Sequence, residues 1–284
     1  MIKLVLTDLD DTLICHGLPR ATDHAIQGIQ AMVDAGLHFG PVSGRIPNDM
    51  GWMFDNHEEC YATGAYCNGM MIYIDGELVH TEPLDGDELN RLAEVLARTG
   101  AGILTMFDVW HGDITSSGYV VTPDDAHAAS MFSHFGVWRR VKRLDKPTYL
   151  KANIHVVGSR EEQTRTRDML REEFPSMDFV FPSGFAPLVD VSPHGWSKGS
   201  AVEVLARELG ITLDEVATFG DSENDLSMIE GIPNAVAVAN ASDQIKRAAR
   251  WQIGASADDA VADALFDIAA AAATGDMPTF MQGK

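Results

Sequence analysis

The chain has 284 residues, a net charge of −21 and a hydrophobic content of 45%. This length allows one large domain or two smaller ones, and the hydrophobic content supports a buried core. The acidic charge argues against nucleic acid or an anionic membrane as a partner, because both bind basic surfaces. It does not exclude a small anionic substrate, since a metal ion and one lysine reverse the potential locally.

The cysteines and the apolar segments favour a cytoplasmic protein without a membrane partner. The three cysteines, Cys15, Cys60 and Cys67, form no CxxC motif, which favours a reducing compartment over a disulfide scaffold. The first residues reach an acidic cluster by position 8, which is not the pattern of a signal peptide. No apolar run approaches the length of a membrane span.

The first notable feature is an acidic turn at 8–12 (DLDDT), directly after the apolar run at 2–7. The run predicts a buried strand that ends in this turn. Asp8 and Asp10 are two residues apart, so in an extended chain they project to the same side. A divalent cation would relieve their repulsion, and the pair could then act as nucleophile and proton donor. The turn alone is equally compatible with a helix N-cap cluster.

Strand and helix patterns alternate through the first part of the chain. A helix is predicted after Thr22, and strands are predicted at 37–42 and near 60–63. Asp75-Gly76, between the predicted strands at 70–74 and 77–81, is a strong hairpin signal.

From about Glu82 the pattern changes to a mixture of helices and strands. The predicted elements are helices beginning at 85, after 123 and over 160–174, and strands at 102–107 and 151–157. They predict an inserted α+β domain over residues 82–185, which is within the usual size range of a domain.

Regular alternation returns after the insert. The predicted strands are 188–191, 216–219 and 235–239, and the predicted helices begin at 197, 242 and 257. These units predict an α/β fold, with a Rossmann-like doubly wound parallel sheet over residues 1–81 and 186–284. Ligands of such sheets bind beyond the carboxyl ends of the strands, where the carboxylates near positions 8 and 221 lie.

Four separated motifs call for one explanation. They are Asp8-x-Asp10-x-Thr12, Ser43-Gly44-Arg45, Ser197-Lys198-Gly199 and Gly220-Asp221-Ser222-x-Asn224-Asp225. Their order and their places at strand ends resemble the haloacid dehalogenase-like (HAD) phosphohydrolases. Asn68-Gly69 and Asn240-Ala241 add a similarity to the Cof-type branch. That branch carries a class-II α/β cap, usually the seat of substrate selectivity, between the second and third motifs, where the insert lies here.

The resemblance implies a Mg²⁺-dependent phosphatase that forms an aspartyl-phosphate. Asp8 would attack phosphorus, and Asp10 would protonate the leaving alcohol and later deprotonate the attacking water. Mg²⁺ would be held by the Asp8 and Asp221 carboxylates and by the backbone carbonyl of Asp10. The other implied roles are phosphate binding by Ser43, Gly44, Lys198 and Asn224, substrate contact by Arg45 and Asn68, and metal support by Asp225.

Several of these residues also fit ordinary structural roles. Ser43-Gly44 and Asn68-Gly69 are typical of turns, and Asp221 is also typical of a helix N-cap. Lys198 near a helix start is unfavourable for the helix dipole, which indicates a functional reason for it.

The leading hypothesis is a phosphatase for a small phosphorylated metabolite, either a sugar phosphate or a cofactor phosphate. A phosphomutase shares the aspartyl-phosphate and remains an alternative. A catalytically silent phosphometabolite-binding protein is a second one, although it would typically lack Asp8, Asp10 or Lys198, and all three are present. A dinucleotide-binding enzyme is disfavoured, because no GxGxxG follows the first strand and no GxxxxGK[ST] occurs.

Overall fold

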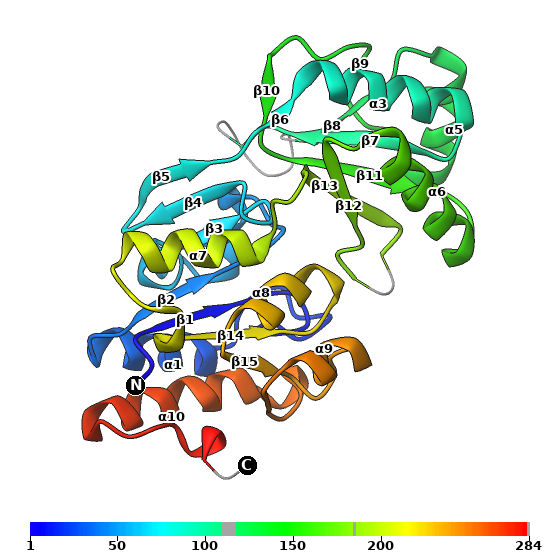
Figure 1. Cartoon of the computed structure of the whole chain (residues 1–284). Helices are drawn as coiled ribbons and strands as arrows, with labels where there is room; N and C mark the ends of the chain where they lie inside the picture. Colours follow the sequence, from blue (N-terminus) through cyan, green and yellow to red (C-terminus); the bar gives the residue numbers. More distant parts are fainter. Residues whose placement is uncertain (110–117, 184–185, 283–284) are drawn as a thin grey trace. The chain divides into compact units, whose positions relative to one another are not determined.

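The structure is a computed structural model, and it describes residues 1–109, 118–183 and 186–282 (Figure 1). The chain divides into two compact units. The first unit comprises Met1–Thr81 and Ser197–Lys284, and the second comprises Glu82–Trp196. The predicted end of the insert, at residue 185, lies outside the described residues.

A five-stranded parallel sheet with the strand order β16-β15-β14-β1-β2 forms the centre of the first unit. Its strands are β1 (Leu4–Thr7), β2 (His38–Pro41), β14 (Val216–Gly220), β15 (Asn234–Ala237) and β16 (Trp251–Gln252). Every residue of β1 and β14 is buried, as expected for central strands covered on both faces. The sheet and its helices confirm the predicted α/β fold class.

Helices cover both faces of this sheet. Helix α1 packs against α10 on one face, and α7 packs against α8 on the other (Figure 1). The helices are α1 (Asp23–Asp34), α2 (Met50–Met53), α7 (Lys198–Glu208), α8 (Leu226–Gly231), α9 (Asp243–Ala248) and α10 (Ala260–Thr274). As predicted, a helix follows Thr22, whose side chain caps α1 by accepting a hydrogen bond from the Ala25 amide at 3.0 Å.

The first unit also holds a three-stranded antiparallel sheet of β3 (Gly64–Tyr66), β4 (Met71–Ile74) and β5 (Glu77–Thr81). The predicted hairpin is confirmed, with φ of 50° at Asp75 and 80° at Gly76. The predicted strand near 60–63 is wrong. Glu58–Cys60 forms a 3₁₀ turn, whose amides bond to nearby carbonyls and so leave no ladder for a strand.

A six-stranded sheet with the order β12-β13-β11-β7-β8-β9 forms the centre of the second unit. Its strands are β7 (Gly102–Phe107), β8 (Gly118–Val121), β9 (Arg140–Val141), β11 (Ala152–Val156), β12 (Met177–Val180) and β13 (Leu188–Pro193). A small second sheet pairs β6 (Leu84–Asp85) with β10 (Thr148–Tyr149). The helices are α3 (Gly86–Thr99), α5 (Asp125–Phe135) and α6 (Arg160–Glu173).

The placement of one strand corrects the sequence analysis. Leu188–Val191 was expected to belong to the catalytic core, but β13 pairs with β11 and β12 of the second unit. Alternation of apolar residues shows that a strand has a buried face, but it does not identify the sheet that the strand joins. Among the described residues, no helix is both long and apolar enough to cross a membrane.

Candidate active site

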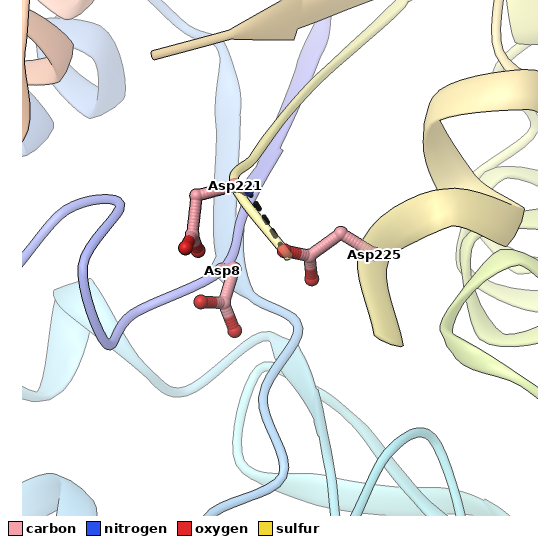
Figure 2. A group of neighbouring side chains, drawn as sticks. All are labelled: Asp8, Asp221 and Asp225. Atoms are coloured by element: carbon pink, nitrogen blue, oxygen red, sulfur yellow. Dashed lines mark hydrogen bonds between the residues drawn. The ribbon is translucent and has the colours of Figure 1, made fainter. Parts of the chain in front are cut away.

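The ends of two neighbouring strands bring Asp8 and Asp221 together. β1 and β14 are paired in register, with Thr7 opposite Phe219, so that Asp8 and Asp221 follow the two strands at the same edge. The carboxylates of Asp8, Asp221 and Asp225 each offer an oxygen within 4.8 Å of the others (Figure 2). The structure therefore brings the first motif, which contains Asp8, next to the fourth motif, which contains Asp221 and Asp225, as the sequence predicted.

Asp225 uses both of its oxygens inside the protein. One accepts a hydrogen bond from Lys198 Nζ at 2.6 Å. The other accepts from the backbone amide of Asp221 at 2.9 Å (Figure 2). It also accepts from the backbone amide of Ser222 at 3.0 Å. A Cβ atom on Gly220 would lie 2.7 Å from Asp225 Cβ, so only glycine fits there. Asp225 therefore holds the loop and the lysine, which agrees with a supporting role rather than a metal ligand.

Lys198 is the first residue of α7, and its side chain is fully buried. Its Nζ lies 2.5 Å from Asp8 Oδ1 and 2.6 Å from Asp225 Oδ1. Burial lowers the pKa of Lys198, but the charges of Asp225 and Asp8 outweigh it and raise the pKa above its ordinary value. The lysine is therefore held as a cation against two carboxylates.

The carboxylates outnumber the lysine. Burial raises the pKa of Asp8 well above its ordinary range, against the opposing effect of Lys198. Burial, and then the charge of Asp225, raise the pKa of Asp221 to about 7, although a hydrogen bond from Thr12 Oγ1 at 2.9 Å opposes this. Three carboxylates around one ammonium group leave a surplus of negative charge, which a divalent cation would neutralise.

The surroundings of the three carboxylates fit Mg²⁺. Asp8 gives one oxygen to Lys198, and Asp221 gives one to Thr12. Each keeps a second oxygen without a hydrogen bond to the described residues, and carboxylate oxygen is the ligand that this hard ion prefers.

Asp10 lies beside this cluster and pairs with Arg45. The Arg45 guanidinium donates from Nε to Asp10 Oδ2 at 2.9 Å and from Nη2 to Asp10 Oδ1 at 2.6 Å. The hydrogen bond to Asp10 raises the pKa of Arg45. β1 ends at Thr7, so the argument from an extended strand does not reach Asp10, and the expectation that the two carboxylates project to one side stays a prediction. Asp8 is buried and Asp10 is exposed.

The loops after β2 and β3 join through backbone hydrogen bonds. The Ser43 amide donates to Ala65 O and the Asn68 amide donates to Ser43 O, both at 2.9 Å. The Ser43 hydroxyl is buried and accepts from the Arg45 amide at 3.2 Å, with Gly44 between them. Asn68 has a left-handed φ of 57° and lies in a turn before Gly69. The structure thus brings Ser43, Arg45 and Asn68 into one loop pair.

Asn224 and Asn240 complete the loops around the cluster. Asn224 accepts a hydrogen bond from Ser222 Oγ at 2.8 Å within the 3₁₀ turn Glu223–Asp225. Asn240 Nδ2 donates to Asp11 O at 2.7 Å, and its Oδ1 accepts from the Ser256 amide. The sequence motifs contained Thr12 and Asn240, but no role was predicted for either. Both side chains bond to residues that are far apart in the sequence, Thr12 to Asp221 and Asn240 to Asp11. The spacing of residues in the sequence cannot predict such contacts.

Comparison with known proteins places the chain in a family. Residues 5–265 match the family of haloacid dehalogenase-like hydrolases. HMP-PP phosphatase from Enterobacter sp. strain 638 is 26% identical over 251 residues, which cover 86% of this chain and 87% of that protein.

Solved structures show the same fold. SMU.1108c from Streptococcus mutans UA159 gives a TM-score of 0.79 at 18% identity, covering 95% of this chain and all of that one. The subclass IIB sugar phosphatase BT4131 gives a TM-score of 0.71 at 19% identity, covering 93% and 97%. The family match spans most of the chain, so this protein belongs to the haloacid dehalogenase-like hydrolases, and it is an enzyme of their Cof-type branch.

Proposed function

We propose that this protein is a Mg²⁺-dependent phosphatase that hydrolyses a small phosphorylated metabolite through an aspartyl-phosphate on Asp8. One observation carries the proposal. Asp8 is buried at the end of β1, where its carboxylate contacts the cationic Lys198. It lies beside the carboxylate of Asp221, which keeps one oxygen without a hydrogen bond to the described residues. A carboxylate in this setting is positioned to attack phosphorus, because the lysine offsets the repulsion between two anions.

The residues of the chain divide the reaction between them. Asp8 attacks phosphorus and the bond to the leaving oxygen breaks. Lys198 stabilises the charge on the phosphoryl oxygens. Asp10 donates a proton to the leaving alcohol and then takes one from the water that hydrolyses the aspartyl-phosphate. Its ion pair with Arg45 has to open before Asp10 can carry that proton, and an arriving phosphoryl group offers Arg45 another anionic partner.

Mg²⁺ would be held by the carboxylates of Asp8 and Asp221 and by the Asp10 backbone carbonyl, with Asp225 fixing the loop behind them. When bound, it supplies charge neutralisation for the phosphoryl group. Ser43, Gly44 and Asn224 would line the phosphate side of the site, and Arg45 and Asn68 the substrate side.

The second unit would act as the cap that selects the substrate. The relatives that match this chain include HMP-PP phosphatase and a sugar phosphatase by name, which supports a cofactor phosphate or a sugar phosphate as the substrate class. A phosphomutase remains the alternative on the same scaffold. A silent binding protein is less well supported, because Lys198 and Asp8 are both present and in contact.

Turnover of a panel of phosphorylated sugars, nucleotides and cofactors with Mg²⁺ tests the proposal. We expect Mg²⁺-dependent release of inorganic phosphate, with a loss of at least about 10⁴-fold in kcat for Asp8→Asn. The matched control is Asp34→Asn at the exposed end of α1, which should keep wild-type turnover. Near-normal kcat in a folded Asp8→Asn protein would contradict the mechanism.

A further inference from the structure

A cavity of about 300 Å³ lies in the first unit, among residues that the proposed reaction does not use. Its volume is at the lower end of the range of small-molecule pockets. All of its lining residues belong to Met1–Thr81, so the cavity is complete within one compact unit. The lining residues are Pro47, Met50, Glu58, Tyr61, Ala62, Tyr66, Tyr73 and Gly76.

Aromatic rings form a large part of the wall. The chain has five tyrosines, and three of them, Tyr61, Tyr66 and Tyr73, line this cavity. The rings of Tyr66 and Tyr73 meet edge to face, with their centroids 5.8 Å apart. Tyr66 is buried and its hydroxyl donates to Tyr61 O, whereas Tyr61 and Tyr73 are only half-buried. Core packing accounts for Tyr66, but the two half-buried rings leave aromatic surface open to a ligand.

Hydrogen bonds hold the walls of the cavity in place. At the turn between β4 and β5, the Gly76 amide donates to Ala62 O at 2.8 Å, and the Asp75 amide donates to Thr63 Oγ1 at 3.1 Å. The Ala62 amide in turn donates to Glu58 O at 2.8 Å. The hairpin and the segment that carries Glu58 are therefore tied together, as expected for a preformed pocket.

The charge of the lining comes from Glu58, since none of the described residues that line the cavity is basic. The Glu58 carboxylate makes no hydrogen bond or ion pair with the described part of the chain. It lies close enough to Tyr61 that its charge adds to the effect of burial in raising the pKa of that hydroxyl. The neighbouring Glu59 differs, because its carboxylate accepts from Gln30 Nε2 at 2.9 Å.

The rings and the carboxylate favour the same kind of ligand. The faces of aromatic rings are negative, so they attract a cation, and tyrosine is among the rings that do this. The carboxylate of Glu58 adds a full negative charge, which repels anions. Pro47 and Met50 offer apolar surface, which suits alkyl groups better than a hydrated metal ion.

We propose that this cavity binds a small organic cation, an ammonium ion with apolar substituents. The site uses none of the residues assigned to the phosphatase reaction. It is also independent of the second unit, because every lining residue lies in the first.

Binding of choline to the full-length protein with ring-labelled tyrosine tests the inference by NMR. Dimethylbutanol, in which carbon replaces the charged nitrogen, is the neutral analogue. Excess Mg²⁺ is present, so that the carboxylates of the candidate active site do not compete for choline. The ring signals of Tyr61 and Tyr73 should shift with choline, whereas Tyr119 and Tyr149 of the second unit are internal controls and should not. Dimethylbutanol should bind at least about tenfold more weakly.

Substitutions of the lining separate the two contributions. Glu58→Gln should weaken choline binding about fivefold, and Tyr73→Leu about threefold. Tyr73→Phe keeps the ring and should bind as the wild type does. The matched control is Glu59→Gln, which removes a neighbouring charge outside the cavity and should keep the wild-type affinity. Thermal unfolding of each variant shows whether a loss of binding reflects a loss of folding.

Absence of choline binding at millimolar concentrations would overturn the inference. Equal affinity for choline and dimethylbutanol would also overturn it, because the cavity would then select apolar groups without regard to charge. Equal losses in Glu58→Gln and Glu59→Gln would show attraction to the acidic surface in general, and would contradict the site. Since binding is measured without turnover, failure of the proposed phosphatase function would leave these results unchanged.

Discussion

Each unit of the protein buries one lysine against carboxylate, but the two clusters differ in charge balance. In the first unit, Lys198 contacts Asp8 and Asp225, and Asp221 adds a third carboxylate. In the second unit, the buried ion pair of Lys151 has one carboxylate, Asp190.

The charge balance distinguishes the two clusters, although the lysine is buried in both. Burial, together with the charges of neighbouring carboxylates, raises the pKa of Asp8 and of Asp221, and the surplus of negative charge in this cluster calls for a cation from outside. A balanced pair calls for no further charge, and its neighbours offer only hydrogen bonds. The first arrangement suits phosphoryl chemistry with a metal ion, whereas the second is a buried ion pair with balanced charge.

Removing the divalent cation should have the largest effect on activity. Excess EDTA should abolish turnover and Mg²⁺ should restore it, because the three carboxylates of the cluster outnumber Lys198. Asp221→Ala should raise the Mg²⁺ concentration for half-maximal activity by at least about tenfold, as even the loss of an outer metal partner does. Titration of activity against Mg²⁺ measures this. Full activity in excess EDTA would contradict the requirement for a metal ion.

Replacement of Asp10, the exposed carboxylate beside the cluster of Asp8, Asp221 and Asp225, should have the next largest effect on activity. Asp10→Asn should slow hydrolysis of an alkyl phosphate by about 10²–10⁴-fold, since an alkoxide leaving group needs a proton. p-Nitrophenyl phosphate has a good leaving group and should lose much less in the first step. Single-turnover rates on the two esters make the comparison, and equal losses would argue against Asp10 as the general acid.

The two lysines should respond differently to the same substitution. Each Lys→Met change leaves buried charge behind and should destabilise the fold by about 3–5 kcal/mol. For Lys198→Met, saturating Mg²⁺ should recover part of the loss, because the ion replaces the missing positive charge. For Lys151→Met, Mg²⁺ should give no recovery beyond its effect on the wild type, and the second change Asp190→Leu should recover stability instead. Urea unfolding with and without Mg²⁺ distinguishes the two.

The smallest expected effect is the change in the stability of each unit with pH in the metal-free protein. Burial lowers the pKa of His127 and His155 in the second unit, so that the folded unit favours their neutral forms. The unfolded chain takes up protons near its ordinary pKa of about 6.5, so that the second unit loses stability as the pH falls below that value. Asp8 and Asp221 have raised pKa values, and the first unit therefore gains stability as the pH falls through about 7.

Hydrogen exchange of peptides from each unit at pH 7.5 and 5.5 measures these opposite trends. After each rate is divided by the intrinsic exchange rate at that pH, acidification should lower the protection of the second unit and raise the protection around β1 and β14. His155→Phe should weaken the trend in the second unit, and the exposed control His38→Asn should leave it intact. The same direction of change in both units would contradict the assignment.

The sequence was enough to predict the parallel sheet and the meeting of Asp8 with Asp221, because both follow from apolar strands and from where such strands end. The support role of Asp225 came from the family resemblance, and its contacts agree with that role. The bidentate pair of Asp10 with Arg45 was not predicted, because it depends on how the chain turns after β1 ends at Thr7.

The second unit was harder to read. Its elements were partly predicted, but β8, β9 and β12 were missed, and β13 was assigned to the wrong sheet. The buried polar residues of its sheet were also not predicted, since they are ordinary residues in separate strands. Only the pairing register places Thr105, Asn153 and Asp190 beside one another.

The central claim is that Asp8 carries the phosphoryl group during turnover, and the most direct measurement is acid quenching of a single turnover. The enzyme is mixed with Mg²⁺ and a ³²P-labelled phosphate ester, quenched within one turnover, and digested for peptide mapping by mass spectrometry. The account predicts acid-stable, alkali-labile label on the peptide that contains Asp8, and none with Asp8→Asn. Label on another residue, or product formation with no labelled enzyme at any time point, would contradict it.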